Sequence, residues 1–284
     1  MTTAADPAAV APPSPPSPTP AAATRRRADS RQNGRPSSLG RLARLISPLV
    51  LVGLWQLASQ TGFLPEKKLA APSTILSTAA DLVREGTLGS QTLISVQRVA
   101  IGLVIGLAVG LVLALLAGLS QVLDLAIDPP MQALRTLPHL GLVPLFIIWF
   151  GLGEEPKLFL IALGVTFPIY LNPLAGIRGI DRKVLEAADS MGLTRLQQVR
   201  YVVLPGALPS ALTGLRQSLG VAWLTLVVAE TIAADSGLGY MINQAREFGF
   251  TDVVVVGLAV YSILGLLTDA VVRSIERRAL AWRS

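Results

Sequence analysis

The chain has no cysteine, and His139 is its only histidine. Disulfide bonds, thiolate chemistry and metal sites built from several histidines are therefore excluded. A lysine never follows a glycine, so the glycine-rich loop with its phosphate-binding lysine is also missing. Charged residues make up only 15 % of the 284 residues. These absences argue against an enzyme that binds ATP within this chain.

Apolar residues are abundant and lie in long blocks. They form 51 % of the chain, and the mean hydropathy is +0.57. A soluble domain of this size needs more polar surface. A membrane helix needs about 20 mostly apolar residues. We therefore predict an all-α polytopic membrane protein in contact with lipid, with about six transmembrane helices over Leu45–Gly62, Val99–Ser120, Met131–Phe150, Lys157–Ile177, Ala211–Ala233 and Asp252–Val272.

The distribution of lysine and arginine predicts the orientation. With a cytoplasmic N-terminus, 18 basic residues fall on the cytoplasmic side and 6 on the outer side. Cytoplasmic segments of membrane proteins carry the basic excess. Both termini are thus expected inside, and the net charge of +6 reflects these loops rather than nucleic-acid binding.

Residues 1–44 differ in composition from the rest. Proline alternates with serine, alanine and threonine, and several arginines follow. Too few apolar side chains are present to offset the entropy of ordering. We predict a disordered Pro/Ala/Arg-rich cytoplasmic tail, followed by a permease domain over residues 45–284. A cleaved targeting peptide is the less favoured reading, because no small-residue cleavage site follows a short apolar core.

Glycine and proline recur inside the predicted spans. Gly102, Gly106 and Gly110 are spaced by four residues, which places bare backbone on one face of a helix. Helix packing is the favoured interpretation of these glycines. Pro129-Pro130 is expected to start the third span, and prolines at 138, 144 and 168 are candidates for kinks.

The segment of about 178–210 carries strong local signals for a helix–turn–helix. Asp181 can cap a helix over Arg182–Met191, and Gly192 suits a left-handed C-terminal turn. Thr194 and Gln197 have the spacing of a capping box. Pro205 is expected to stop the second helix. The charge distribution places this loop in the cytoplasm.

A helix–turn–helix can bind DNA, but here both ends are tethered to membrane spans. The second helix is mostly apolar and offers few polar side chains for reading bases. Docking onto a protein partner is therefore the better interpretation, and no nucleic-acid partner is expected.

The residues of this loop resemble the EAA signature of ABC importer permeases. Glu186-Ala187-Ala188, then Gly192, then Val202-Val203-Leu204-Pro205 match the family spacing, with Val202 in place of the usual isoleucine. The resemblance extends over about 45–284. The stretches 137–151, 167–172 and 220–240 resemble the nitrate/sulfonate/taurine branch, and 220–240 resembles the aliphatic sulfonate permeases in particular.

The resemblance implies a type I ABC importer permease fold with a coupling loop that docks onto an ATPase. It implies two ATPase subunits, a second permease copy and an external periplasmic or lipid-anchored solute-binding protein. This chain would have no catalytic residue and no cofactor, since ATP would be bound by the partner. In the coupling loop, Glu186 would have a structural and electrostatic role, Met191 would fill a groove of the ATPase, and Gly192 would set the turn.

Three residues near the fifth span are candidates for the translocation path. Arg216 either reaches back to the cytoplasmic surface or lines the path and attracts an anion. Glu230 is expected near the outer end, where it contacts substrate or the binding protein, and Trp223 lies between them. Asp269 and Arg273 have the spacing of a helical ion pair.

Two other classes of protein remain as alternatives. A secondary transporter would usually show two related halves, and no such internal repeat is seen. An intramembrane enzyme would need a nucleophile with a base, or paired acids, deep within the spans, and none is placed there.

Overall fold

The computed structural model describes residues 38–66 and 68–283, so the predicted tail up to residue 37 lies outside the described residues. Those described residues form helices and no strand. The chain divides into two units, 1–54 and 55–284. Helix α2 (Ser38–Gln60) begins within the range predicted as tail, seven residues before the predicted boundary.

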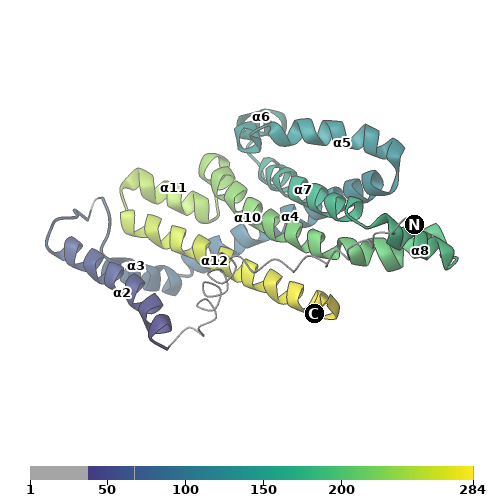
Figure 1. The fold of residues 1–284 in the computed structure, drawn as a ribbon. Coiled ribbons are helices and arrows are strands. Elements are labelled where there is room, and N and C mark those ends of the chain that lie inside the picture. The colour runs from purple at the N-terminus through teal and green to yellow at the C-terminus, as the bar shows by residue number, and fades with distance from the viewer. Residues whose placement is uncertain (1–37, 67, 284) are drawn as a thin grey trace, which may run out of the picture. The chain divides into compact units, whose positions relative to one another are not determined.

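The second unit contains the remaining helices (Figure 1). In chain order they are α3 (Pro72–Arg84), α4 (Thr87–Leu119), α5 (Gln121–Thr136), the 3-10 turn η1 (His139–Leu142), α6 (Val143–Phe150), α7 (Glu155–Arg178), α8 (Arg182–Ser190), α9 (Arg195–Gln198), the π-helical turn η2 (Val199–Val203), α10 (Leu204–Ala233), α11 (Leu238–Phe248), α12 (Thr251–Ala279) and the 3-10 turn η3 (Ala281–Arg283).

Four continuous helical stretches of the described chain are long and apolar enough to cross a membrane: α4, α7, the run 195–232, and α12. The pair α5 and α6 passes the same test as one span bent by 83°. In α2 the apolar described part is Leu49–Gln60, which is shorter. The predicted second, fourth, fifth and sixth spans are thus present, and the third is a broken span.

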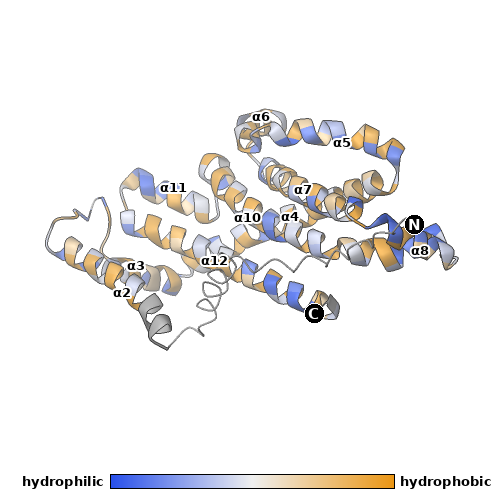
Figure 2. Ribbon diagram, viewed as in Figure 1, coloured by the Kyte–Doolittle hydropathy of each residue, from blue (hydrophilic) through white to orange (hydrophobic). Residues whose placement is uncertain are grey.

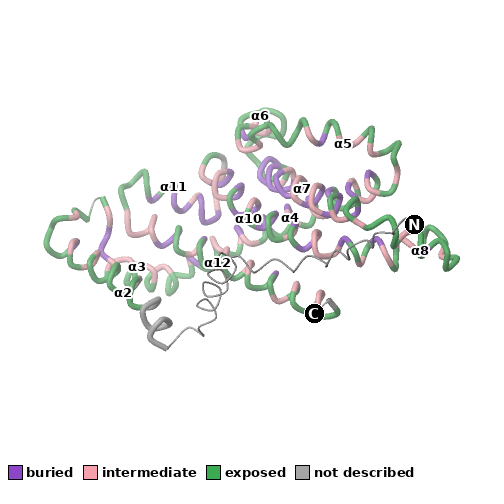
Figure 3. Tube along the Cα trace, viewed as in Figure 1, coloured by how far each residue is buried: buried purple, intermediate pink, exposed green. Residues whose placement is uncertain are grey.

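Helix α7 is central to the second unit, and buried residues run along it (Figure 3). It packs against α4 on one side and α10 on the other. The buried cluster includes Ile161, Val165 and Ile169 of α7 with Leu226 of α10. Because lipid tails are as apolar as these side chains, close van der Waals packing stabilises the three-helix arrangement.

The glycines at 102, 106 and 110 face α7, as predicted. A Cβ at Gly102 would lie 2.6 Å from Ile161 Cγ2, and one at Gly106 would lie 2.6 Å from the Ala162 carbonyl oxygen. At Gly110 the nearest atom, Ile169 Cγ2, would be at 2.8 Å. The absence of side chains at these positions allows the backbones of α4 and α7 to approach closely.

The expectation that Pro129-Pro130 starts a helix is wrong. Helix α5 begins at Gln121, with the Ser120 side chain as its cap, and both prolines lie inside it. The helix ends at Thr136, and the extended backbone of its C-cap Leu137 (ψ 133°) precedes Pro138. The residue before a proline is disfavoured in the helical region, so Pro138 produces the break that the earlier proline pair does not.

Hydrophilic residues gather on α8 and in the last turns of α12 (Figure 2). The last turn of α12 contains Arg277 and Arg278, and α8 begins with Arg182 and Lys183. These are segments that the basic-residue count assigns to the cytoplasmic side.

Candidate functional site

The predicted turn of the cytoplasmic loop is present in full. Asp181 caps α8 by accepting a hydrogen bond from the Lys183 backbone N–H at 2.9 Å. The Gly192 N–H donates to the Asp189 carbonyl at 2.9 Å and the Leu193 N–H to the Ala188 carbonyl at 3.1 Å. This pair of bonds defines a Schellman motif, and Gly192 adopts the left-handed φ of +74° that it requires.

The second half of the loop begins as predicted but does not end as predicted. Thr194 and Gln197 form a capping box, with the Thr194 N–H donating to Gln197 Oε1 at 2.8 Å. The expectation that Pro205 stops this helix is wrong, because α9, η2 and α10 form one continuous helical run. A proline ring clashes with the carbonyl four residues earlier, and the wider π-turn over Val199–Val203 lies where that clash would occur.

Helix α8 has one buried face and one open face. Ala188 is buried, and Leu185 packs against Ile177, Val203 and Ala207. On the open face Met191 is 79 % exposed. Leu196 of α9 is also 79 % exposed, so two large apolar side chains project from a polar loop. Such a feature is typical of a protein-docking surface.

The remaining signature residues lie on α8 and at the start of α10. Glu186 is exposed and forms an ion pair with Arg182 at 3.2 Å, and Ala187 is exposed beside it. Leu204 is exposed and Pro205 half-buried at the start of α10. Contact of these residues with an ATPase stays a prediction.

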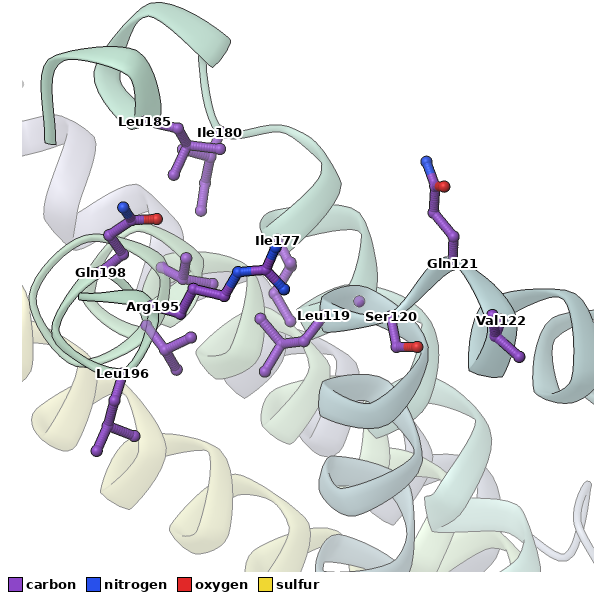
Figure 4. Close-up of a pocket in the computed structure, with 13 residues that line it drawn as sticks. Leu119, Ser120, Gln121, Val122, Ile177, Ile180, Leu185, Arg195, Leu196 and Gln198 are labelled. Carbon is purple, nitrogen blue, oxygen red and sulfur yellow. The ribbon is translucent and has the colours of Figure 1, made fainter. Parts of the chain in front are cut away.

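A pocket of about 790 Å³ lies behind the loop (Figure 4). Its walls come from the ends of α4 and α5, from Ile177 and Ile180, and from Leu185 and the α9 region. Arg195 extends into it toward Ile177 (Figure 4).

Arg216 is paired with two carboxylates of α12. Its Nη2 donates to Glu276 Oε2 at 2.7 Å, and its Nε lies 3.4 Å from Asp269 Oδ1. Asp269 also forms the predicted ion pair with Arg273, at 3.1 Å. The charge of Arg216 is therefore balanced within the chain, and its role in a translocation path stays a prediction.

Trp223 and Glu230 are buried inside the chain. Trp223 Nε1 donates to Thr268 Oγ1 at 3.1 Å, and its ring meets Tyr261 edge-on. Glu230 is 1 % exposed, so in this structure it is not available to a binding protein at the surface. Contact of either residue with substrate requires another conformation and stays a prediction.

Glu230 belongs to a buried ion cluster that the sequence reasoning missed. Arg98 of α4 is 3 % exposed, and its Nη1 donates to Glu230 Oε1 at 2.6 Å and to the Ser236 carbonyl at 2.6 Å. Glu230 also accepts hydrogen bonds from Ser95, from Tyr261 and from the Gly239 N–H. This cluster joins α4, α10, α11 and α12.

The cluster extends to the loop before α7. Arg98 Nε and Nη2 donate to the two oxygens of Glu154 at 2.7 and 2.6 Å, and buried Lys157 donates to Glu154 at 3.0 Å. The hydrogen bond from Arg98 lowers the pKa of Glu154 to about 2, against the raising effect of partial burial. The predicted second span began at Val99, whereas α4 begins at Thr87 and so encloses Arg98. The available signal in the sequence for this buried cluster was Arg98 itself, a charged residue directly before the apolar run that begins at Val99.

The described chain thus combines apolar spans, a broken span, and a structured polar loop with exposed apolar side chains. This combination is typical of a membrane-spanning transport subunit. Residues 102–280 match the family described as the binding-protein-dependent transport system inner membrane component, and the chain belongs to that family. It is a multi-pass membrane protein and an ABC importer permease.

Related proteins and solved structures agree with this assignment. The chain is 43 % identical over 240 residues to the aliphatic sulfonates transport permease protein SsuC of Bacillus subtilis (strain 168), covering 84 % of this chain and 87 % of that protein. It is 48 % identical over 242 residues to SsuC of Escherichia coli (strain K12), covering 85 % and 92 %. The taurine transport system permease protein TauC of the same strain is 38 % identical over 245 residues, covering 86 % and 89 %.

Among solved structures, an amino acid ABC transporter superposes with a TM-score of 0.57 at 20 % identity, covering 66 % of this chain and 92 % of that one. An inward-facing MetNI methionine ABC transporter gives a TM-score of 0.56 at 20 % identity, covering 65 % and 92 %. These structural similarities show that the chain has the fold of the permease subunits of ABC importers.

Proposed function

We propose that this chain is the permease of an ATP-driven importer for aliphatic sulfonates in the bacterial cytoplasmic membrane. Its similarity to proteins named as sulfonate permeases, at 43 % and 48 % identity, exceeds that to a taurine permease at 38 % and a nitrate permease at 30 %. Taurine is itself a small sulfonate, so these names favour an anion with a sulfonate group.

The working transporter in this proposal contains two copies of this chain, two ATPase subunits that bind ATP, and an external solute-binding protein. The observation that carries the proposal is the cytoplasmic loop, where Met191 and Leu196 project beside a rigid Schellman turn. Exposed apolar side chains with fixed backbone geometry suit a groove on a partner protein.

The continuous helix explains how docking at the loop moves the spans. The run from Arg195 to Ile232 passes through η2 without a break, so displacement of the loop is transmitted along α10 toward its outer end. ATP binding would bring the ATPase subunits together and move the two loops inward. The spans would then tilt as rigid bodies and open the path to the outside, where the binding protein delivers its cargo.

Reconstitution in lipid vesicles tests the proposal. We expect ATP-dependent uptake of a radiolabelled alkanesulfonate only when permease, ATPase and binding protein are all present. Uptake by the purified permease alone would indicate a secondary transporter instead. If the complete complex takes up nitrate but not sulfonates, the chain is an importer permease as proposed, but its substrate is not a sulfonate.

A substitution in the turn tests the docking loop directly. Gly192→Asp introduces a side chain at φ +74°, which costs about 1 kcal/mol and places a charge beside Met191. We expect pull-down of the cognate ATPase with tagged permease to fall about fivefold, as a loss of about 1 kcal/mol would produce. The matched control is Gly249→Asp, at φ +76° in the turn after α11. Equal recovery of the ATPase by both variants would show that the loop is not the contact.

A further inference from the structure

Helix α10 carries polar residues on a face that the chain leaves uncovered. Thr213, Gln217 and Gly220 are exposed and follow one another by four and three residues, so they share one face of the helix. A Cβ at Gly220 would meet nothing within 4 Å. Asn172 of α7 adjoins this face, because its Nδ2 donates to Gln217 Oε1 at 3.0 Å. We call these four residues the polar stripe.

The polar stripe lies in the middle of a span. Gln217 is about 20 Å along α10 from its first residue, at 1.5 Å per residue. The opposite face of the same helix is buried, with Ser218, Ala222 and Leu226 at 0 % exposure. Amide side chains are costly in hydrocarbon and face the interior of a bundle or a water-filled cavity. The polar stripe is therefore not a lipid-facing surface.

The hydrogen bonding at the stripe leaves donors available. Asn172 Nδ2 is shared between Gln217 Oε1 and the Pro168 carbonyl, at 3.0 and 2.9 Å. Gln217 Nε2 donates to no group within the described part of the chain, so both of its N–H bonds are open to another molecule. The nearby basic residue Arg216 turns toward Asp269 and Glu276. What the stripe offers is thus the two neutral N–H donors of Gln217, because both N–H bonds of Asn172 are used within the chain.

We propose that Gln217, oriented by its hydrogen bond from Asn172, forms an anion-coordinating site on the translocation path, where its two free N–H bonds bind the sulfonate oxygens of the substrate. This inference rests on the proposed function. Neutral amide donors hydrogen-bond an anion without the strong charge attraction of a buried arginine. A passing substrate must leave again, so moderate binding of this kind suits transport.

The absence of cysteine in the chain makes the test direct. Thr213→Cys, one turn from Gln217, leaves both amide side chains in place; it is assembled with the ATPase and the binding protein in vesicles, and uptake is measured first. The thiol is then treated with an anionic sulfonatoethyl or a cationic trimethylammonioethyl methanethiosulfonate. The thiolate, which forms in contact with water, attacks these reagents. Thr213→Cys combined with Gln217→Leu lacks the proposed donor and should lose protection by an anion. Leu266→Cys on the exposed apolar face of α12 and buried Ala222→Cys are the controls.

We expect the stripe cysteine to react in at least one nucleotide state while both control cysteines do not. With each rate divided by that of the same reagent with a free thiol in solution, the anionic reagent should be favoured about tenfold over the cationic one. Hexanesulfonate at about ten times its Kd should slow the reaction about tenfold. If nitrate slows the reaction of the stripe cysteine and hexanesulfonate does not, the stripe is an anion site, but the substrate is not a sulfonate.

Two outcomes would overturn the inference. A stripe cysteine that stays unreactive in every nucleotide state would show that lipid or the second permease copy covers the face, so that it does not line a water-filled path. Equal reaction with both reagents and no protection by any anion would show a wet surface without an anion site. Sulfonate uptake by the wild-type complex is measured in parallel. This measurement tests the proposed function independently of the anion site.

Discussion

At the scale of single residues, the most constrained part of the chain is the buried pair of Arg98 and Glu230. Both side chains are almost fully enclosed, with exposed fractions of 3 % and 0 %. A buried charge is tolerated only when it is paired and hydrogen-bonded. Here the guanidinium has partners in Glu154, Glu230 and Ser236, and the carboxylate has partners in Ser95, Tyr261 and Gly239.

Glu230→Gln should destabilise the protein because it removes one of the two negative charges that balance Arg98. We expect a loss of about 3 kcal/mol in the free energy of unfolding, at the low end for breaking a buried pair because Glu154 remains. Unfolding of the permease in detergent micelles measures this loss. The exposed Glu247→Gln on α11 is the matched control and should change stability by less than about 0.5 kcal/mol. Equal stability of the two variants would contradict the buried-pair assignment.

Glu154 predicts a dependence on pH. Its pKa is lowered to about 2, so the ionised form is stabilised by folding. That contribution is complete above the ordinary carboxyl pKa of about 4.3 and is lost as the pH falls toward about 2. The difference in melting temperature between wild type and Glu154→Gln should therefore shrink over this range. It should be small throughout because the side chain is half exposed. A difference that does not change with pH would contradict this assignment.

At the scale of helices, packing of α4 against α7 depends on the missing side chains at 102, 106 and 110. Gly106→Ala would place a Cβ 2.6 Å from the Ala162 carbonyl oxygen and 2.7 Å from Val165. Forcing an extra carbon into this contact should cost about 1–3 kcal/mol. Gly89→Ala lies on the same helix with nothing within 4 Å and should be neutral or slightly stabilising. Thermal unfolding in detergent compares the two, and equal melting temperatures would refute the close-packing role.

The continuous run of α9, η2 and α10 shows that neighbouring residues alone do not predict where this helix ends. Pro205 favours a helix end when judged by its neighbours alone. In the fold, a π-turn over Val199–Val203 precedes it, and Val203 packs against Ile177 and Ala207. This tertiary contact stabilises the continuous helix, so that the second half of the loop (α9 and η2) and α10 form one helical run.

At the scale of the whole molecule, residues 1–37 lie outside both the described part of the chain and the family match over 102–280. We predict that deleting residues 2–37 leaves ATP-dependent uptake intact, because the coupling loop and the spans are retained. Uptake by the reconstituted complex is the measurement, with protein amount in the vesicles as the control. Loss of uptake at normal protein amount would show an active role for this segment.

Much of this molecule follows from the sequence alone. The apolar blocks predict the helical membrane fold because hydrocarbon requires every backbone polar group to be satisfied within the chain. The loop signals at Asp181, Gly192, Thr194 and Gln197 are confirmed because caps and left-handed turns depend on neighbouring residues. The four-residue glycine spacing likewise predicts a packing face, because the helical period alone places these residues together.

Other features were decided only by tertiary structure. The partners of Arg98 lie 56 and 132 residues away, and no local pattern connects them. The same holds for the burial of Trp223 and Glu230, which the sequence had suggested for a translocation path. It also holds for the polar stripe, whose exposure depends on which faces of α10 its neighbours cover. Local order follows from adjacent residues, whereas burial, charge pairing and accessible surface depend on how distant helices pack.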